Sequence, residues 1–225
     1  NVTATGPSKI YGTALSAGIS GTNFTHTGEI AGEAVDSVTL TPDAAGLAAD
    51  THAGLGYVVT PSLATGTGGF LASNYNITYD HYDGTVAQKQ LSIAAPTLTK
   101  TKEYDGGVTA AVTAGTLSGK VGADVVTIDT ATATYATSAV GDPKTITVVY
   151  TITGTDAANY LAPANTVDTA GAITAKALNV TATGPSKIYG TALSAGTSGT
   201  NFSAGATGVG SEVVTSVTLT PDAAG

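Results

Sequence analysis

Apolar and polar residues alternate along much of the chain with a period of two. The clearest run is TITVVYTITG at residues 145–154, where Ile146, Val148 and Tyr150 alternate mostly with Thr. Successive side chains of a strand point to opposite faces, so this pattern predicts a half-buried β-strand. Further strands are predicted at residues 38–41, 56–60, 75–79, 125–128 and 131–136.

Turn-forming residues separate these segments at short intervals. The stretches TPDAAG, ATGTGG, HYDGT, VGDPK and TGTDAAN combine Gly, Asp, Asn and Pro, which favour tight turns. No window carries a sustained apolar period of 3.6 residues, so helix is expected only as about one turn after Pro42. Short strands with regular turns predict an all-β chain of tandem Ig-like β-sandwich modules in an elongated array.

A long internal duplication organises the chain. Residues 1–18, NVTATGPSKIYGTALSAG, return without change at residues 179–196, an offset of 178. The match continues through GTNF and SVTLTPDAAG, with one residue inserted between them in the second copy. The intervening stretches, THTGEIAGEAV and SAGATGVGSEVV, are predicted to be exposed loops, because loops tolerate changes of length.

A weaker second rhythm divides this period in two. KIYG opens one unit and KEYDGG the next, Asn-Tyr pairs lie near both unit ends, and GTVAQKQLSI corresponds to GAITAKALNV. The predicted modules are therefore residues 1–90, 91–177 and 178–225, and the last holds only the front half of a module. Half a sandwich leaves strand edges unpaired, so we expect a neighbouring chain to complete it, unless the sequence is a window on a longer repeat.

The motifs resemble two families of repeats. The first module, with KIYG, VTLTPDAAG and NYNITYDHYDGTV, resembles the MBG repeats of bacterial surface proteins. The second, with KEYDGG, GTLSG, ATATYAT, GTDAANY and ITAKAL, resembles the YDG repeats that often alternate with MBG. The resemblance implies an extracellular or cell-surface location in a large adhesin-like protein, and it implies neither a ligand nor a catalytic residue.

Composition narrows the classes of partner. Eight Lys, no Arg and sixteen acidic residues give a net charge of −8, and the Lys residues are scattered. Nucleic acid and anionic membrane surfaces, which bind clustered basic residues, are therefore disfavoured. No apolar run reaches the roughly 18 residues of a spanning helix, so no membrane insertion is expected. Cys is absent, so stability has to come from packing rather than from disulfides.

Candidate chemistry is sparse. No nucleophile motif, phosphate loop, dinucleotide fingerprint or zinc motif occurs, and His26, His52 and His81 lack metal-ligand spacing and are interpreted as surface-loop residues. We therefore expect no enzyme, no catalytic residue and no cofactor. The one metal candidate is Ca²⁺ at the turn with Asp80 and Asp83, although Asp also caps tight turns through its own backbone.

Two other kinds of site can be considered. Lys9 with Asn74 or Asn76, and Lys102 with Asn159, have the strand placement of an isopeptide bond, although Lys can also snorkel and Asn cap a turn. Tyrosines at equivalent motif positions are predicted to pack in the core or at a joint, with the hydroxyl bonded at the rim: Tyr11, Tyr104 and Tyr189. A second tyrosine group is predicted to be structural, with sugar binding as the alternative: Tyr75, Tyr79 and Tyr82.

The function expected from the sequence is that of a structural repeat. The chain is interpreted as a stalk or fibre segment of a bacterial cell-surface or extracellular matrix adhesin-like protein, with neighbouring copies or adjacent repeats as its partners. The alternative is a module that binds a surface glycan or a protein ligand.

Overall fold

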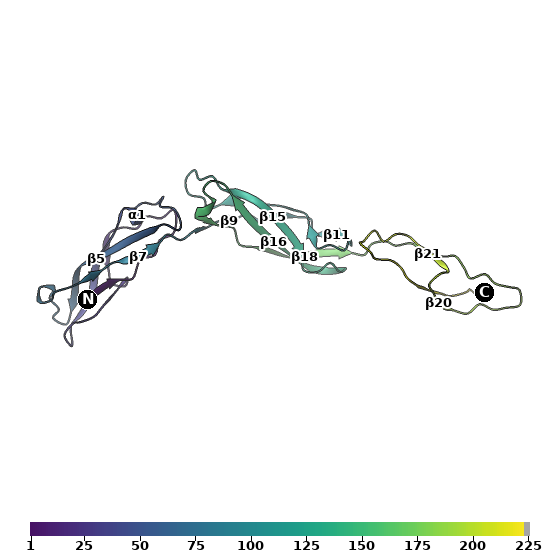
Figure 1. Ribbon diagram of the computed structural model, residues 1–225, viewed down its shortest axis with the longest axis horizontal. Coiled ribbons are helices and arrows are strands. Elements are labelled where there is room, and N and C mark those ends of the chain that lie inside the picture. The colour runs from purple at the N-terminus through teal and green to yellow at the C-terminus, as the bar shows by residue number, and fades with distance from the viewer. Residues whose placement is uncertain (223–225) are drawn as a thin grey trace. The chain divides into compact units, whose positions relative to one another are not determined.

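The computed structural model describes residues 1–222 and consists almost entirely of β-strands (Figure 1). Helix within these residues is limited to α1 (Ala44–Leu47) and the 3-10 turns η1 (Ala72–Asn74) and η2 (Ala157–Asn159). None of the helices in this part of the chain is long and apolar enough to cross a membrane. The prediction of an all-β chain is confirmed.

The chain forms two compact units that interleave along the sequence. Unit 1 contains residues 1–96, 114–131 and 150–164, and unit 2 contains residues 97–113, 132–149 and the chain from residue 165 onward. The modules 1–90, 91–177 and 178–225 remain a prediction from the sequence repeat.

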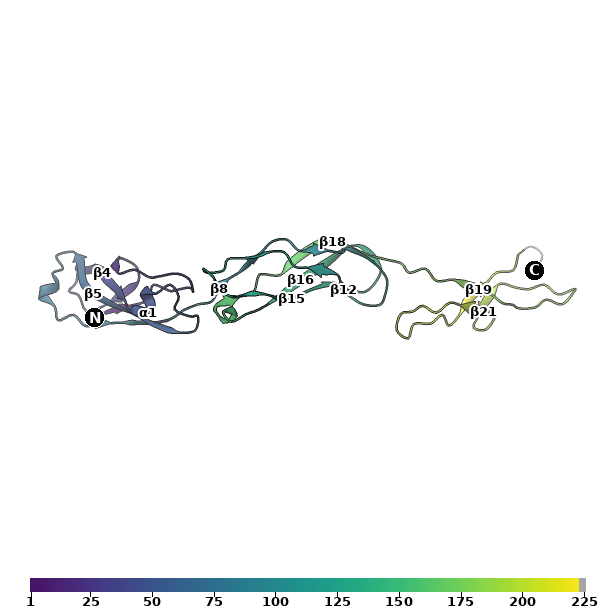
Figure 2. The same ribbon diagram turned by 90° about the horizontal axis from the view of Figure 1, so that it is seen from above.

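Unit 1 is built around two sheets. In the first, β1 (Val2–Ala4) lies between β3 (Phe24–His26), which is antiparallel, and β6 (Tyr79–Asp80), which is parallel. The second is antiparallel, in the order β2 (Gly18–Ser20), β4 (Ala34–Pro42), β5 (Gly56–Thr67) and β7 (Tyr82–Thr85). Figure 2 shows β4 and β5 side by side with α1 next to them.

The alternation of apolar residues places one core between these sheets. Val2 and Ala4 of β1, Val38 of β4 and Val59 of β5 are buried in the same hydrophobic cluster. Polar residues of the same strands, such as Thr41, remain exposed. Period-two patterning therefore assigns one face of each strand to the core, as the sequence predicted.

The single turn of α-helix forms where the sequence reads TPDAAG. Asp43 is the N-cap, and its side chain accepts a hydrogen bond from the backbone N–H of Gly46 at 2.7 Å. Asp is among the preferred N-cap residues because it satisfies a donor that the first helical turn leaves unpaired. The expected turn of helix after Pro42 is confirmed.

Short strand pairs complete unit 1 beyond residue 86. The strand β8 (Lys89–Gln90) is parallel to β17 (Tyr160–Leu161), and β9 (Ser92–Ile93) is antiparallel to β14 (Leu117–Ser118). Leu91, between β8 and β9, is buried in the same hydrophobic cluster as the residues of the two sheets. The core of unit 1 therefore extends continuously past residue 90.

Unit 2 contains most of a five-stranded sheet. Its order is β11 (Thr101–Glu103), β18 (Thr166–Thr174), β16 (Gly141–Thr153), β15 (Thr127–Tyr135) and β12 (Thr109–Ala110). The strands β15 and β16 each run from one unit into the other along the chain. Ile146 and Val148 of β16 are buried, which confirms the strand predicted from TITVVYTITG. A separate antiparallel pair joins β10 (Thr97–Leu98) to β13 (Val112–Thr113).

Two equivalent glycines allow close packing beside long strands. Gly84 and Gly171 begin the corresponding stretches GTVAQKQLSI and GAITAKALNV. A Cβ at Gly84 would lie 2.2 Å from the ring of Tyr57, and one at Gly171 would lie 2.7 Å from the carbonyl oxygen of Lys144. The glycines recur at this position because any side chain would collide with a neighbour.

The duplicated sequence folds with the same strand register in both copies. The strand β19 (Val180–Ala182) pairs with β21 (Phe202–Ala204), and β20 (Gly196–Ser198) pairs with β22 (Val217–Leu219), as β1 pairs with β3 and β2 with β4. The burial differs sharply, since Tyr11 is 4% exposed and Tyr189 is 102% exposed. The prediction of a packed tyrosine is wrong for Tyr189, because the described part of the second copy has no counterpart of the segments that cover Tyr11.

Candidate functional site

A carboxylate in unit 1 holds two buried tyrosine hydroxyls. Asp124 Oδ2 accepts hydrogen bonds from Tyr11 Oη at 2.8 Å and from Tyr160 Oη at 2.5 Å. The hydroxyl of Tyr160 in turn accepts from the backbone N–H of Val121 at 2.8 Å. Both tyrosines are almost fully buried and Asp124 is half-buried, so water has little access to this cluster. We call Tyr11, Asp124 and Tyr160 the tyrosine–aspartate cluster.

Aromatic packing and a close backbone approach hold the cluster. The rings of Tyr11 and Tyr160 meet edge to face, with centroids 5.4 Å apart and planes at 82°. Gly12 has φ +83°, and a Cβ there would lie 2.4 Å from Val121 Cγ2. Edge-to-face rings are a favourable aromatic geometry, and only glycine fits next to Val121. Tyr11 and Gly12, the last two residues of KIYG, therefore form these contacts.

A second polar contact lies on the other side of Tyr11. The imidazole of His52 stacks on the Tyr11 ring at 6.2 Å and accepts at Nδ1 from Asn159 Nδ2 at 2.9 Å. The side-chain oxygen of Asn159 accepts from the backbone N–H of Ala53 at 3.0 Å. Asn159 is 2% exposed and uses both ends of its amide, so it is a satisfied buried polar group.

The backbone brings these side chains together from distant parts of the sequence. The N–H of Tyr11 donates to the carbonyl of Ala87, and Ala87 donates to the carbonyl of Lys9. Four residues further on, Leu91 N–H donates to the carbonyl of Leu161, next to Tyr160. Residues 87–91 are therefore bonded first to the KIYG segment and then to β17, with no free linker between them.

Burial and the shared acceptor keep both hydroxyls protonated. Burial is the largest cause that raises the pKa of Tyr160, to about 12, and the hydrogen bond to Asp124 raises it further. The pKa of Tyr11 is raised even more by the same two causes. At neutral pH both tyrosines therefore donate to Asp124, which suits a structural clamp rather than proton transfer.

This pKa shift predicts a loss of stability at alkaline pH. The folded state holds the Tyr160 proton more tightly than the unfolded state, whose tyrosines titrate near pH 10. The stabilisation is complete below about pH 10 and is lost as the pH rises towards the folded value of about 12. We expect the thermal unfolding midpoint to fall over this range, and to fall less steeply in Tyr160→Phe. Circular dichroism at stepped pH measures both slopes, and equal slopes would contradict the assignment.

The metal candidates Asp80 and Asp83 have separate partners. Asp80 Oδ2 accepts from Asn1 Nδ2 at 2.9 Å, and Asp83 Oδ2 lies 3.4 Å from His81 Nε2. Within residues 1–222, no three His, Cys, Asp or Glu side chains come together in a way that could hold a metal ion. Calcium takes six to eight oxygen ligands, so the geometry of this turn does not favour the predicted Ca²⁺ site.

The three tyrosines of the sugar-binding alternative are half-buried against the core. Tyr75 stacks on Phe70 at 5.2 Å, and Tyr82 meets Tyr57 edge to face at 6.2 Å. The hydroxyl of Tyr79 accepts from the backbone N–H of Ala64 at 3.0 Å. Their rings are thus used in packing, which agrees with the structural interpretation of this group.

The lysines proposed for isopeptide bonds have other partners. Lys9 is 1% exposed, and its ammonium donates to the carbonyl oxygens of Thr13, Gly46 and Ala48. Lys102 donates to Asp105 at 2.6 Å and to the carbonyl of Gly107 at 2.8 Å. An isopeptide bond needs the ammonium next to an Asn side chain, so these contacts do not support the bond that was considered for Lys9 and Lys102.

Sequence reasoning found some members of the site and missed others. The recurrence of Tyr11 predicted a packed tyrosine with a bonded hydroxyl, and that prediction is confirmed. Asp124 was not singled out by any motif. His52 does lie exposed in a loop, as predicted, but its contact with Asn159 was not foreseen. The available signal was the second Asn-Tyr pair, because Asn159 and Tyr160 both carry the contacts of the site.

Comparison with known proteins identifies part of the chain. Residues 87–167 match the YDG domain family. No curated protein and no solved structure matches the chain. The matched segment includes Asp124, Asn159 and Tyr160, whereas Tyr11 and His52 lie before it.

Proposed function

We propose that the chain is a structural repeat segment, a stalk or fibre, of a secreted adhesin-like protein at a bacterial cell surface or in an extracellular matrix. It extends or assembles without catalysis. The observation that carries the proposal is the tyrosine–aspartate cluster, which joins the YDG domain to the residues before it through buried side chains. A chain whose role is length needs such a joint, because a flexible linker would let successive domains fold back on each other.

The duplication supports this proposal. Residues 1–46 return almost unchanged at residues 179–225, on the other side of the YDG domain. We propose that residues 1–90 form an MBG-like module of Ig-like sandwich type and that residues 178–225 are the front half of a second one. The KIYG motif that builds the cluster in the first copy is present unchanged in the second. When each repeat contains the residues that form its joint with the next, further repeats can be added with the same contacts at every joint.

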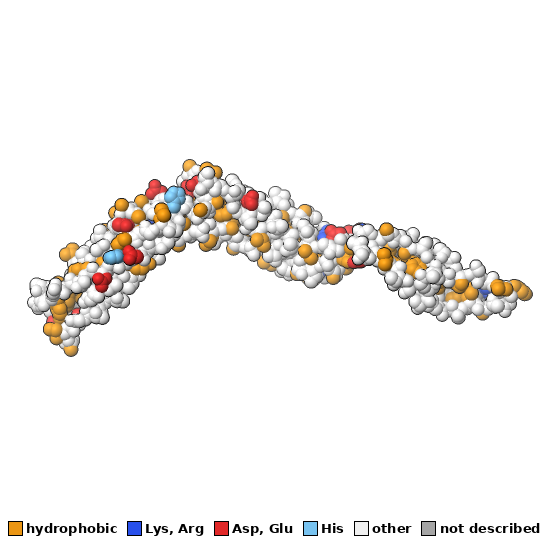
Figure 3. Space-filling model, viewed as in Figure 1, with side chains coloured by type: hydrophobic (Ala, Val, Ile, Leu, Met, Phe, Trp, Pro, Cys, Tyr) orange, Lys and Arg blue, Asp and Glu red, His pale blue; other side chains and the backbone are white. Residues whose placement is uncertain are grey.

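The surface chemistry agrees with a structural role. Charged side chains are few and dispersed among uncharged ones on the face shown in Figure 3. The tyrosines that could stack on a sugar are engaged in the core instead, so ligand binding is the less supported of the two functions. The net charge of −8 keeps copies mutually repelling except where specific contacts form.

A measurement of joint rigidity tests the proposal. The chain contains no Cys, so spin labels can be placed at Ile19→Cys and Thr127→Cys, two exposed positions on either side of the cluster. We expect double electron–electron resonance to give a narrow distance distribution that broadens in Asp124→Ala. The matched control is Asp142→Ala, an exposed Asp outside the cluster, which should leave the width unchanged. An equally narrow distribution in Asp124→Ala would refute a rigid joint at this cluster.

A further inference from the structure

The two copies of the repeat carry equivalent loops in different surroundings. The first-copy loop (residues 27–33) and the second-copy loop (residues 205–212) lie between corresponding strands. Each closes with the same backbone bond, from Glu33 N–H to the carbonyl of Ile30 and from Glu212 N–H to the carbonyl of Val209, both at 3.0 Å. Both loops therefore hold an apolar residue, Ile30 or Val209, three positions before a Glu in the same backbone turn.

In unit 2 the second-copy loop is docked on a turn of the YDG domain. That turn, residues 102–107, is the Tyr104 turn. Glu212 Oε1 accepts from Tyr104 Oη at 2.5 Å, and Val209 is 5% exposed. A Cβ at Gly106 would lie 2.7 Å from Val209 Cγ1, so the valine sits directly on this glycine. The loop thus contributes one apolar contact and one charge-assisted hydrogen bond.

The Tyr104 turn is prepared for this contact by its own side chains. Asp105 Oδ1 accepts from Lys102 Nζ at 2.6 Å and from the backbone N–H of Gly107 at 2.8 Å. Tyr104 also lines a hollow together with Val140, Leu178 and Val209. Gly106 has φ +78° and offers bare backbone to the incoming residue. The turn is therefore held by hydrogen bonds of its own, and Val209 of the loop completes the hollow beside it.

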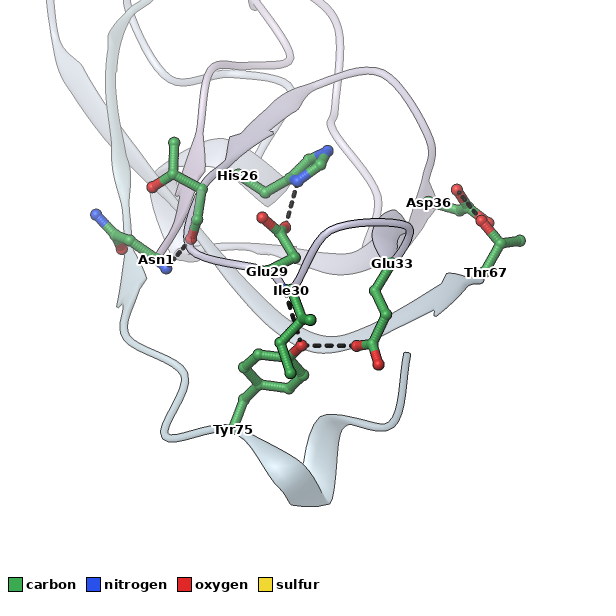
Figure 4. Close-up of polar contacts among 9 residues, drawn as sticks. Asn1, His26, Glu29, Ile30, Glu33, Asp36, Thr67 and Tyr75 are labelled. Carbon is green, nitrogen blue, oxygen red and sulfur yellow. Dashed lines mark hydrogen bonds and ion pairs between the residues drawn. The ribbon is translucent and has the colours of Figure 1, made fainter. Parts of the chain in front are cut away.

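The first-copy loop shows the same two features without a covering partner in unit 1. Ile30, the counterpart of Val209, is 67% exposed. Glu33 Oε2 accepts from Tyr75 Oη at 2.6 Å, and the same hydroxyl accepts from Ile30 N–H at 3.2 Å (Figure 4). A carboxylate accepts about four hydrogen bonds, so Tyr75 fixes Glu33 and leaves Oε1 able to accept another.

We propose that the first-copy loop is a docking surface for the Tyr104 turn of a second copy of this chain. Ile30 takes the place of Val209 against Gly106, and Glu33 takes the place of Glu212 on the Tyr104 hydroxyl. The contact joins unlike surfaces, so it links copies head to tail. Within one chain the second-copy loop competes for the same turn at a high effective concentration, so docking between chains requires that loop to be displaced. The inference rests on the proposed assembly role and names its partner.

Disulfide trapping between two variants of the full chain tests the contact. The donor chain carries Gly106→Cys, with Val209→Ser and Glu212→Gln to release its own loop, and the acceptor chain carries Ile30→Cys. We expect mixed disulfide to form at least about tenfold faster than with Ile19→Cys, a matched control at a position 81% exposed. Glu33→Gln in the acceptor should slow the reaction. Equal rates for Ile30→Cys and Ile19→Cys would overturn the proposal.

Gly106 has a positive φ, so Gly106→Cys can strain the turn. A second variant that keeps Gly106 tests the same contact. In a full chain whose residues 203–212 are replaced by residues 25–33, the grafted loop should bind Tyr104 in place of the native one. The hydrogen bond that the Tyr104 hydroxyl donates to Glu212 raises the pKa of Tyr104, and Glu212→Gln is expected to remove that shift. Tyrosine absorbance should show the raised pKa in the graft, and a Tyr104 that titrates as in Glu212→Gln would also overturn the proposal. Neither readout involves Asp124, so this failure is distinct from failure of the rigid joint.

Discussion

Asp124→Ala is expected to lower the free energy of unfolding of unit 1 by about 3 kcal/mol. The substitution leaves the hydroxyls of Tyr11 and Tyr160 without their shared acceptor, and both tyrosines are buried where water has little access. Each buried donor that loses its partner costs about 1 to 3 kcal/mol. Urea denaturation followed by circular dichroism and tyrosine fluorescence measures the change.

Two controls separate the cluster from a general effect of removing a carboxylate. Asp129 lies five residues away, is exposed, and should tolerate Ala within about 0.5 kcal/mol. The triple variant Tyr11→Phe, Tyr160→Phe and Asp124→Leu removes donors and acceptor together and should recover part of the loss, because no polar atom of these side chains is then left unpaired. A cost for Asp124→Ala no greater than that for Asp129→Ala would mean that the cluster does not stabilise unit 1.

Local patterns predicted the parts of the fold that depend on neighbours in sequence. The alternation at residues 145–154 predicted β16. The sequence TPDAAG predicted α1, because Asp43 caps the helix that follows it. The strand expected at residues 75–79 is wrong for residues 75–78, since only Tyr79 belongs to β6. The side chains of Tyr75 and Ile77 pack on the core from an irregular segment that follows η1. The alternating pattern therefore indicated correctly which side chains are buried, but it did not indicate a paired strand.

The tyrosine–aspartate cluster depends on contacts that no local pattern encodes. Tyr11 and Asp124 are 113 residues apart, and His52 is 107 residues from Asn159. The sequence could show that Tyr11 recurs, but one sequence cannot pair it with a particular acid. The same limit applies to Tyr189, whose identical local sequence lies in a fully exposed environment. Burial is therefore a property of the surrounding segments and not of the motif.

The structure gives each residue of KIYG a separate task in the first copy. Ile10 forms a parallel bridge with Ala87, Tyr11 enters the tyrosine–aspartate cluster, and Gly12 admits Val121. Lys9 turns to the other side and reaches the loop around α1. One tetrapeptide thus ties residues 44–48, the segment at residue 87 and the YDG domain together, which explains why its second copy would be retained without change in a repeat of this kind.

Lys9→Met is expected to lower the free energy of unfolding by about 2 to 3 kcal/mol. Met keeps the apolar stem but removes the ammonium that donates to the carbonyl oxygens of Thr13, Gly46 and Ala48. Burial lowers the pKa of Lys9, which shows that desolvating its charge is costly, so part of the loss is offset when the charge is removed. The net effect remains unfavourable because the Thr13 carbonyl loses its donor, while the carbonyls of Gly46 and Ala48 keep only Leu15 N–H and Thr51 Oγ1.

The repeat supplies the matched control for this change. Lys187 has the same four neighbours on each side in sequence as Lys9. It differs in burial, because it lies exposed in the second copy. Lys187→Met should therefore change the unfolding free energy by no more than about 0.5 kcal/mol. Thermal and urea denaturation of the two variants in parallel compares one substitution in one motif at two levels of burial. Equal effects at the two sites would show that the loss comes from the motif itself and not from the carbonyl cage around the Lys9 ammonium.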